Sequence, residues 1–256
     1  MNKRSNWAVP YAIFLALFVV LPLVLIAVYA FKDSATGRFT LANLWAFFTE
    51  PKIVNAFLVS LEIAFENTLI CILIGYPVAY ILADKSLNRS AVTAVLFILP
   101  MWINALMRTI ATSEIFSAMG VTLGKGTLLF GMAYDYLPFM IYPIYNILNR
   151  MDKSYAEAAQ DLGASPLQVF TKVTLPLSMP GVLSGVLMVF MPTVSTFAIS
   201  EILTNNTIQL FGSVIQDHFY NMMWNQGAAL ALMMLIIIGL TTLIQQAGSL
   251  NPREGT

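Results

Sequence analysis

Five ionisable side chains fall inside stretches of sequence that are otherwise apolar. The acids are Glu62, Glu66, Asp135 and Glu201, and the base is Arg108. A charged group within a membrane span is costly, so each of these residues is a candidate functional residue. Four acids against one base favour a cation and would repel phosphate or sulfate. The sequence therefore predicts a path for a positively charged solute.

Aromatic side chains lie close to these charges. They are Trp102, Tyr134, Tyr136 and Phe197. An aromatic ring attracts a cation held over its face, and its apolar surface can contact methylene groups. These four rings are therefore candidates for cation–π contact with the solute.

Each charged residue also has a structural interpretation. Arg108 could neutralise one of the acids, because buried charges normally pair. Glu62 and Glu66 lie four residues apart, on one helix face, and could be a solvated outer helix end. Asp135 could form an interhelical hydrogen bond instead of lining the path. Trp102 could anchor its helix at the membrane interface.

The composition identifies a membrane protein. The chain has 256 residues, of which 58% are hydrophobic and 10% are charged, whereas a soluble domain has about 25% charged residues. The net charge is zero, which argues against a general nucleic-acid role. A single cysteine, Cys71, and a single histidine, His218, exclude an intrachain disulfide framework and a multi-histidine metal site. We therefore expect no metal site and no cofactor in this chain.

No grouping of residues predicts an enzyme. The nearest approach to a phosphate-binding loop is GVTLGKG, from Gly120 to Gly126. Its glycine spacing is one residue too short, and Gly126 replaces the Ser or Thr that would hold magnesium. We interpret the segment as an external turn.

Six stretches are apolar over about the 20 residues that a span requires. They are Val9–Phe31, Ala56–Ala83, Ala91–Ile110, Leu128–Leu148, Pro180–Leu203 and Gly227–Gln246. Pro100, Asn104 and Arg108 interrupt the third. The first is too long for a signal peptide and lacks a clean cleavage site. The predicted fold is an all-α bundle of six transmembrane helices, forming a single domain over residues 1–256.

The distribution of basic residues predicts the orientation. With the amino terminus inside, eight basic residues are cytoplasmic and five are outside or within the membrane, which follows the positive-inside rule. The eight are Lys3, Arg4, Lys85, Arg89, Arg150, Lys153, Lys172 and Arg253, and the five are Lys32, Arg38, Lys52, Arg108 and Lys125. Six spans then place both termini in the cytoplasm.

A polar segment, Asn149–Met179, separates the fourth and fifth spans on the predicted cytoplasmic side. Ser154 and Glu157 have the spacing of a capping box, which predicts a helix over about Tyr155–Leu162. Gly163 is a favoured helix end. The pattern alone fits a docking element and also fits an amphipathic element packed under its own bundle.

A second helix is predicted in the same segment. Ser165 and Pro166 begin it, because proline is favoured in the first turn. Leu167, Phe170 and Val173 share one face. Pro176 and Pro180 are expected to end it and to return the chain to the membrane.

The motif in this segment resembles the EAA loop of ABC-importer permeases. The matching residues are Glu157, Ala158, Ala159, Gly163, Leu175 and Pro176, and Val173 stands where the family usually has Ile. The resemblance implies a coupling helix that docks on a separate ATPase subunit, which binds ATP and Mg. It also implies that Glu157 makes polar contact with that ATPase and that Gly163 permits the turn.

A wider resemblance covers the chain from about residue 55. The stretches Leu99–Arg108, Tyr134–Tyr145 and Phe197–Leu203 are similar to the first permease subunit of bacterial spermidine/putrescine importers. The resemblance implies a type I importer fold, with Glu201, Trp102 and Asn104 on the substrate path. The stretch Thr112–Thr127 is short for that family.

The same resemblance implies the partners and the location. We expect a second homologous permease, two ATPase subunits and an external solute-binding protein, in the bacterial cytoplasmic membrane. Two alternatives are the same scaffold with iron, a sugar or an anion as solute, and an ion-coupled secondary transporter. The second would use Asp135 and Glu201 as proton or sodium sites.

Overall fold

The computed structural model describes residues 9–34, 36–84 and 91–249. Every regular element in these ranges is a helix, and one isolated β-bridge joins Lys32 to Phe39. The all-α prediction is confirmed. Five of the basic residues that support the predicted orientation lie outside the described ranges, namely Lys3, Arg4, Lys85, Arg89 and Arg253.

Contacts divide the chain into two compact units. The first comprises the described parts of residues 1–57 and 211–247. Its elements are α1 (Val9–Leu15), the π-helical turn η2 (Ala16–Val20), α2 (Leu21–Ala30), α3 (Ala42–Thr49), the start of α4 (Pro51–Ala83), α12 (Phe211–Tyr220) and most of α13 (Trp224–Ser249). Phe47, Phe57 and Phe211 meet edge to face in its core, with ring centroids 5.3 to 5.6 Å apart.

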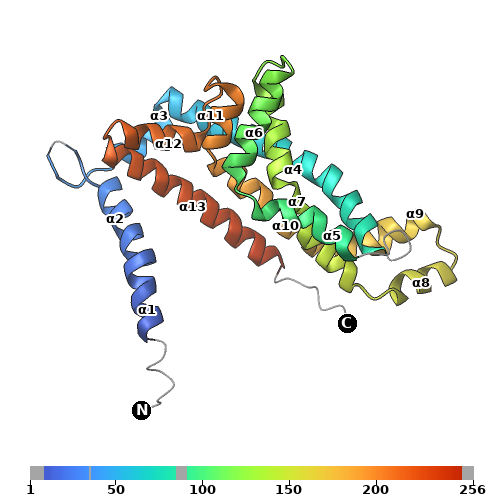
Figure 1. Cartoon of the computed structure of the whole chain (residues 1–256). Helices are drawn as coiled ribbons and strands as arrows, with labels where there is room; N and C mark the ends of the chain where they lie inside the picture. The colour runs from blue at the N-terminus through green and yellow to red at the C-terminus, as the bar shows by residue number, and fades with distance from the viewer. Residues whose placement is uncertain (1–8, 35, 85–90, 250–256) are drawn as a thin grey trace, which may run out of the picture. The chain divides into compact units, whose positions relative to one another are not determined.

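The second unit comprises the described parts of residues 58–210 and 248–256. It contains the rest of α4, then α5 (Ala91–Ile98), the 3₁₀ turn η3 (Leu99–Trp102), α6 (Ala105–Ala118), α7 (Lys125–Arg150), α8 (Ser154–Asp161), α9 (Pro166–Val169), the π-helical turn η4 (Phe170–Thr174), α10 (Leu175–Ser195) and α11 (Ala198–Thr204). Helix α7 packs along α10, and α8 follows the carboxyl end of α7 (Figure 1).

Glycine allows the helices around α7 to approach closely. Gly75 of α4 and Gly185 of α10 both face Met140 of α7, and a Cβ on Gly185 would lie 2.7 Å from its Sδ atom. A Cβ on Gly181 would lie 2.9 Å from the backbone oxygen of Pro143. Small residues are common where membrane helices approach closely, because van der Waals packing holds such helices together.

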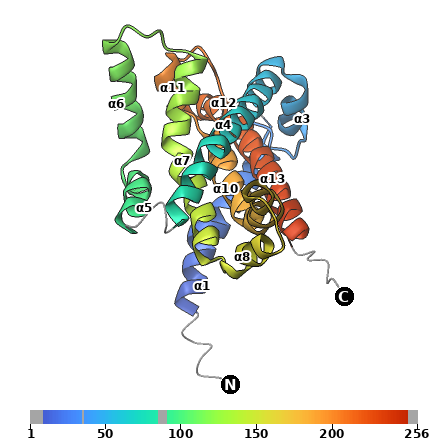
Figure 2. The same ribbon diagram turned by 90° about the vertical axis from the view of Figure 1, so that its right-hand side faces the viewer.

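The predicted third span, Ala91–Ile110, is wrong as a single helix. The helical run Val92–Trp102 and helix α6 meet at an angle of 91° (Figure 2). The break contains Pro100 and extended Ile103, and the Asn104 side chain accepts hydrogen bonds from the backbone N–H groups of Leu106 and Met107. A new helix therefore starts at the break with its own cap.

The position of α6 also changes the length of the connection before α7. Helix α6 continues to Ala118, so only residues 119–124 join it to α7. Much of the stretch Thr112–Thr127, which the sequence suggested to be short, is therefore helical. The short turn contains Gly120, whose φ of +69° favours glycine.

Pro176 and Pro180 do not end a helix, which corrects the predicted boundary at Met179. The chain is helical from Pro166 to Ser195. In the π-helical turn η4, the N–H of Leu175 donates to the carbonyl of Phe170, five residues earlier. This wider turn changes the hydrogen-bond register directly before Pro176, so the missing donor of proline does not break the helix.

The span count is not confirmed as six. Four described helical runs are long and apolar enough to cross a membrane, and the bent pair of α5–η3 with α6 would be a fifth. Helix α7, the predicted fourth span, is outside this group although it has 26 residues. Its tyrosines and Asp135 make it more polar than the four helical runs that qualify. The predicted fifth span also stops at Ser195, and α11 follows as a separate short helix.

We predict that Gly181→Ala destabilises the protein, because the added methyl group would meet backbone atoms that cannot rotate away. Overpacking of this kind costs about 1–3 kcal/mol. Thermal unfolding in detergent should show a lower melting temperature. Gly239→Ala is the matched control, since nothing lies within 4 Å of a Cβ there. Equal melting temperatures for both variants would contradict the close packing.

Candidate substrate path and coupling segment

Arg108 and Asp135 form a buried ion pair between α6 and α7. The Arg108 Nη2 atom lies 3.1 Å from Asp135 Oδ1, and the two side chains are 6% and 1% exposed. Nη2 also donates to the backbone oxygen of Asp135 at 3.3 Å, and the Thr109 hydroxyl donates to Oδ2 at 3.0 Å. The structural interpretation of Arg108 is confirmed. Asp135 bonds to α6, as its structural interpretation predicted. The other interpretation was that Asp135 lines the path.

An aromatic ring lies beside this ion pair. The ring of Tyr134 lies 5.3 Å from the guanidinium carbon, a distance that allows cation–π attraction. The pair is neutral as a whole, although Arg108 Nε and Nη1 find no hydrogen-bond partner among the described residues. Because the charges are shielded from water, loss of one partner would leave an uncompensated charge.

A second cluster joins α4 to the start of α7. The Lys125 ammonium lies 2.5 Å from Glu62 Oε1 and 2.8 Å from Glu66 Oε1. The three side chains are 44%, 56% and 35% exposed in that order, so solvent weakens the attraction. One ammonium against two carboxylates leaves one negative charge. Sequence reasoning missed Lys125 because it was assigned to an external turn, whereas the structure places it in the first turn of α7.

The other predicted path residues lie at or near the ends of helices that contact α7. Asn104 caps α6, and Trp102, two residues before it, is 85% exposed. Phe197 directly precedes α11 and is 40% exposed, and Glu201 is partly buried in the first turn of that helix. The Thr127 hydroxyl donates to the Leu203 carbonyl at 2.8 Å and ties α11 to α7. These residues therefore come from separate elements that share α7 as their support.

The candidate coupling segment, residues 149–179, begins with a different cap from the one predicted. Helix α8 starts at Ser154, and the backbone N–H of Ser154 donates to Asp152 Oδ1 at 3.0 Å. The predicted capping box of Ser154 with Glu157 is therefore wrong. The same hydrogen bond lowers the pKa of Asp152 below its usual value. The ionised carboxylate therefore stabilises the protein fully when the pH is above the usual pKa of aspartate. This stabilisation is lost as the pH falls through the lowered pKa.

Gly163 makes the turn between α8 and α9. Its φ is +83°, its N–H donates to the Gln160 carbonyl at 2.8 Å, and the N–H of Ala164 donates to the Ala159 carbonyl at 3.0 Å. This is a Schellman motif, which favours glycine. Ser165 and Gln168 then form a capping box that starts α9. The prediction that α8 ends at Gly163 is confirmed.

The coupling segment presents apolar and acidic groups to its surroundings. Tyr155, Leu162 and Leu167 are 58%, 90% and 71% exposed. Glu157, Ala158 and Pro176 are also exposed, whereas Ala159 and Leu175 are partly buried. Leu167 therefore does not share the packed face of Phe170 as the sequence suggested. A surface of this kind is suited to contact with another protein.

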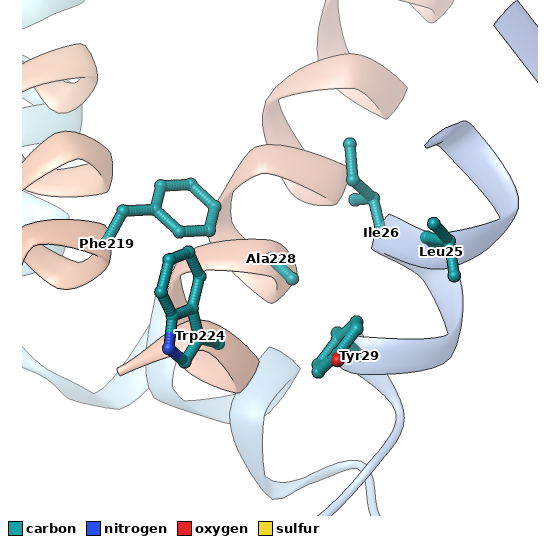
Figure 3. Close-up of a pocket in the computed structure, with 6 residues that line it drawn as sticks. All are labelled: Leu25, Ile26, Tyr29, Phe219, Trp224 and Ala228. Carbon is teal, nitrogen blue, oxygen red and sulfur yellow. The ribbon is translucent and has the colours of Figure 1, made fainter. Parts of the chain in front are cut away.

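The first unit contains an apolar pocket of about 350 Å³ (Figure 3). Its lining residues are Leu25, Ile26, Tyr29, Phe219, Trp224 and Ala228. None of these side chains carries a charge, so the pocket offers no carboxylate to a cationic solute. The predicted path residues lie elsewhere, in the second unit.

Comparison with known proteins identifies the family. Residues 2–253 match the family described as binding-protein-dependent transport system inner membrane component. The chain belongs to this family. It is 33% identical, over 90% of its length, to the spermidine/putrescine transport system permease protein PotB of Escherichia coli strain K12 and of Salmonella typhimurium strain SL1344, and covers 92% and 88% of those chains.

A solved structure supports the same fold. One chain of a bacterial ABC transporter involved in the import of the acidic polysaccharide alginate superposes with a TM-score of 0.74. The match covers 96% of this chain and 98% of that chain at 18% identity, so it bears on the fold alone. Together with the family, it confirms the resemblance to type I ABC-importer permeases. The protein is therefore a permease subunit of an ABC importer, a multi-pass component of the cytoplasmic membrane and not an enzyme.

We predict that Arg108→Gln lowers the stability of the fold, because it leaves the Asp135 carboxylate buried without a counter-charge. Breaking a buried pair in this way costs about 3–5 kcal/mol. Thermal unfolding of the purified protein measures the effect. The matched control is Lys52→Met, since Lys52 lies 4.0 Å from Asp217 with both side chains well exposed. If both variants unfold at the same temperature, the buried pair does not stabilise the α6–α7 contact.

Proposed function

We propose that this chain is a permease subunit of an ATP-driven importer of polyamines such as spermidine and putrescine. The observation that carries the proposal is its similarity over 90% of its length to two spermidine/putrescine permeases. The residue chemistry supports it independently, because carboxylates and aromatic rings are concentrated around α7 and a polyamine is a flexible chain of ammonium groups.

The substrate path would use groups from several helices. Glu201, Phe197, Trp102, Asn104 and Tyr134 are the proposed contacts around α7. Glu62 and Glu66 share one net negative charge with Lys125, and a substrate ammonium can take the place of Lys125 between them. Asp135 joins the path only in a conformation in which its pair with Arg108 opens.

The coupling segment, residues 149–179, would dock on an ATPase subunit. Glu157, Ala158 and Ala159 lie on α8, Gly163 forms the turn, and Leu175 and Pro176 begin α10. In the proposed complex, this chain pairs with a second homologous permease and each permease binds one of two ATPase subunits. ATP closes the ATPase dimer, the coupling segments approach each other, and the spans open outward to accept substrate from an external binding protein. Both termini and the coupling segment are cytoplasmic in this arrangement.

The competing proposals make different demands on the chain. The same scaffold could carry iron, a sugar or an anion, but the acids of the second unit disfavour an anion. An ion-coupled secondary transporter would need Asp135 free to take up a proton or sodium, whereas Asp135 is 1% exposed and paired with Arg108. Such a carrier would also give the coupling segment no role.

The substrate can be tested by competition. Cells that lack their own polyamine uptake, and that express this chain with its partner subunits, should accumulate radiolabelled spermidine. Unlabelled putrescine should compete, and ferric iron, a disaccharide and an oxyanion should not. Competition by one of these three, without competition by polyamines, would assign the permease to another solute.

We predict that Gly163→Ala impairs uptake. An alanine forced into the left-handed backbone region costs roughly 1–2 kcal/mol, which would distort the turn between α8 and α9. Uptake and co-purification of the ATPase subunits are the measurements. Gly120→Ala is the matched control, because Gly120 has a φ of +69° and also has open space around its Cα atom. Equal effects on uptake would mean that the turn at Gly163 has no special part in coupling.

We predict that Glu201→Gln weakens transport of a polyamine, because it removes a negative charge from the path without changing the size of the side chain. The expected rise in KM for spermidine is about tenfold, equal to roughly 1.4 kcal/mol. Concentration-dependent initial rates of uptake measure it. Glu114→Gln is the control, since Glu114 is an exposed acid on α6. An unchanged KM in the Glu201 variant would remove this residue from the path.

A further inference from the structure

Phe170 lies between two tyrosines of α4. Its ring centroid is 5.8 Å from that of Tyr76 and 5.7 Å from that of Tyr80, at interplanar angles of 84° and 86°. Tyr76 and Tyr80 are four residues apart and therefore share one face of α4. Each edge-to-face contact is worth about 0.5–1.5 kcal/mol beyond the burial of area.

A buried hydrogen bond accompanies these ring contacts. The hydroxyl oxygens of Tyr76 and Ser178 are 2.8 Å apart, and Ser178 donates its proton to the Leu175 carbonyl at 3.0 Å. Because a hydroxyl group has one proton, Tyr76 must donate to Ser178. Tyr76 is 7% exposed and Ser178 is fully buried. We name the four residues Tyr76, Tyr80, Phe170 and Ser178 the aromatic clamp.

The aromatic clamp sits where the coupling segment enters the bundle. Phe170 is the first residue of η4, directly after α9, whereas Leu162 and Leu167 just before it are exposed. Val169 and Thr174, on either side of Phe170 along the chain, are buried. A force applied to α8 or α9 therefore reaches the packed part of the molecule at Val169 and Phe170.

We propose that the aromatic clamp makes α4 move together with the coupling segment, so that Phe170 is a positioning residue for ATP-driven transport. The proposal rests on the docking of α8 and α9 to an ATPase. Helix α4 runs without a break from Tyr80 back to Glu62, a distance of about 27 Å at 1.5 Å per residue. The aromatic clamp thereby links the coupling segment to the cluster of Glu62, Glu66 and Lys125.

The first test separates ATP hydrolysis from transport. The full chain, assembled with its partner permease and ATPase subunits, is placed in proteoliposomes with the external binding protein and spermidine. Phe170→Ala should keep the ATPase subunits bound and ATP hydrolysis within about twofold, while spermidine imported per ATP falls about tenfold, as expected when both ring contacts are lost. Phe170→Tyr, which keeps the ring, should restore the ratio.

The matched control is a variant of an exposed aromatic residue on α4. Phe65→Ala removes an aromatic side chain from α4, at a position that is 66% exposed, and should leave the ratio unchanged. If Phe170→Ala imports as much spermidine per ATP as the unmodified chain, or simply loses its ATPase subunits, the proposal is overturned.

A cross-link tests the aromatic clamp in a single folded sample. Cysteines are placed at Tyr80 and Phe170 in a chain whose single native cysteine, Cys71, is replaced by alanine. The unlinked protein lacks both rings and should couple poorly. A bifunctional thiol reagent that joins the two cysteines should raise spermidine imported per ATP, because the link again holds η4 to α4. A cross-linked protein that imports no more per ATP than the unlinked one would show that the two elements need not move together. Failure of the proposed substrate would instead be seen in the unmodified complex, as absence of spermidine uptake.

Discussion

Close contact between α7 and its neighbours is the constraint on which the second unit depends. Lipid gives no hydrophobic driving force between helices, so they associate through packing and interhelical hydrogen bonds. Gly75 and Gly185 admit Met140 from two sides, and the Asn67 side chain donates to the Thr193 hydroxyl at 2.9 Å to join α4 to α10. A larger residue at either glycine would move α7, and with it Lys125, Asp135 and the connection to α8.

The charges of the second unit divide by their exposure. Arg108 and Asp135 are buried and neutralise each other, and thus hold α6 against α7 without adding net charge. Glu62, Glu66 and Lys125 are partly exposed and retain one negative charge. An exposed cluster can exchange its lysine for another cation at little cost, because water already screens it. A buried pair cannot do so unless the helices separate. This difference supports the proposal that the exposed cluster serves the substrate, whereas the buried pair stabilises the fold.

Several features could be predicted from the sequence because they follow from local patterns. The helical class follows from apolar runs, the end of α8 follows from Gly163, and the pairing of Arg108 follows from the cost of a lone buried charge. The substrate-path residues and the ATPase contacts stay predictions, since they depend on a ligand and on other chains.

Other features could not be predicted because they depend on tertiary geometry. A π-helical turn carries the chain past Pro176, and this turn has no simple pattern in the sequence. The bend at Pro100 was visible as an interruption, but its angle of 91° depends on how α6 packs on α7. Lys125 contacts Glu62 and Glu66 only because a short connection places it in the first turn of α7. The contact of Phe170 with two tyrosines about 90 residues earlier in the chain likewise has no local signal.

The most direct test of this account is the energy source of transport. The assembled complex is reconstituted in proteoliposomes, with the binding protein and radiolabelled spermidine outside, and is supplied in turn with internal ATP, a proton gradient or a sodium gradient. The account predicts uptake with ATP alone, and no uptake with either gradient when ATP is absent. Uptake driven by an ion gradient in the absence of ATP would contradict it, because the coupling segment would then have no ATPase to serve.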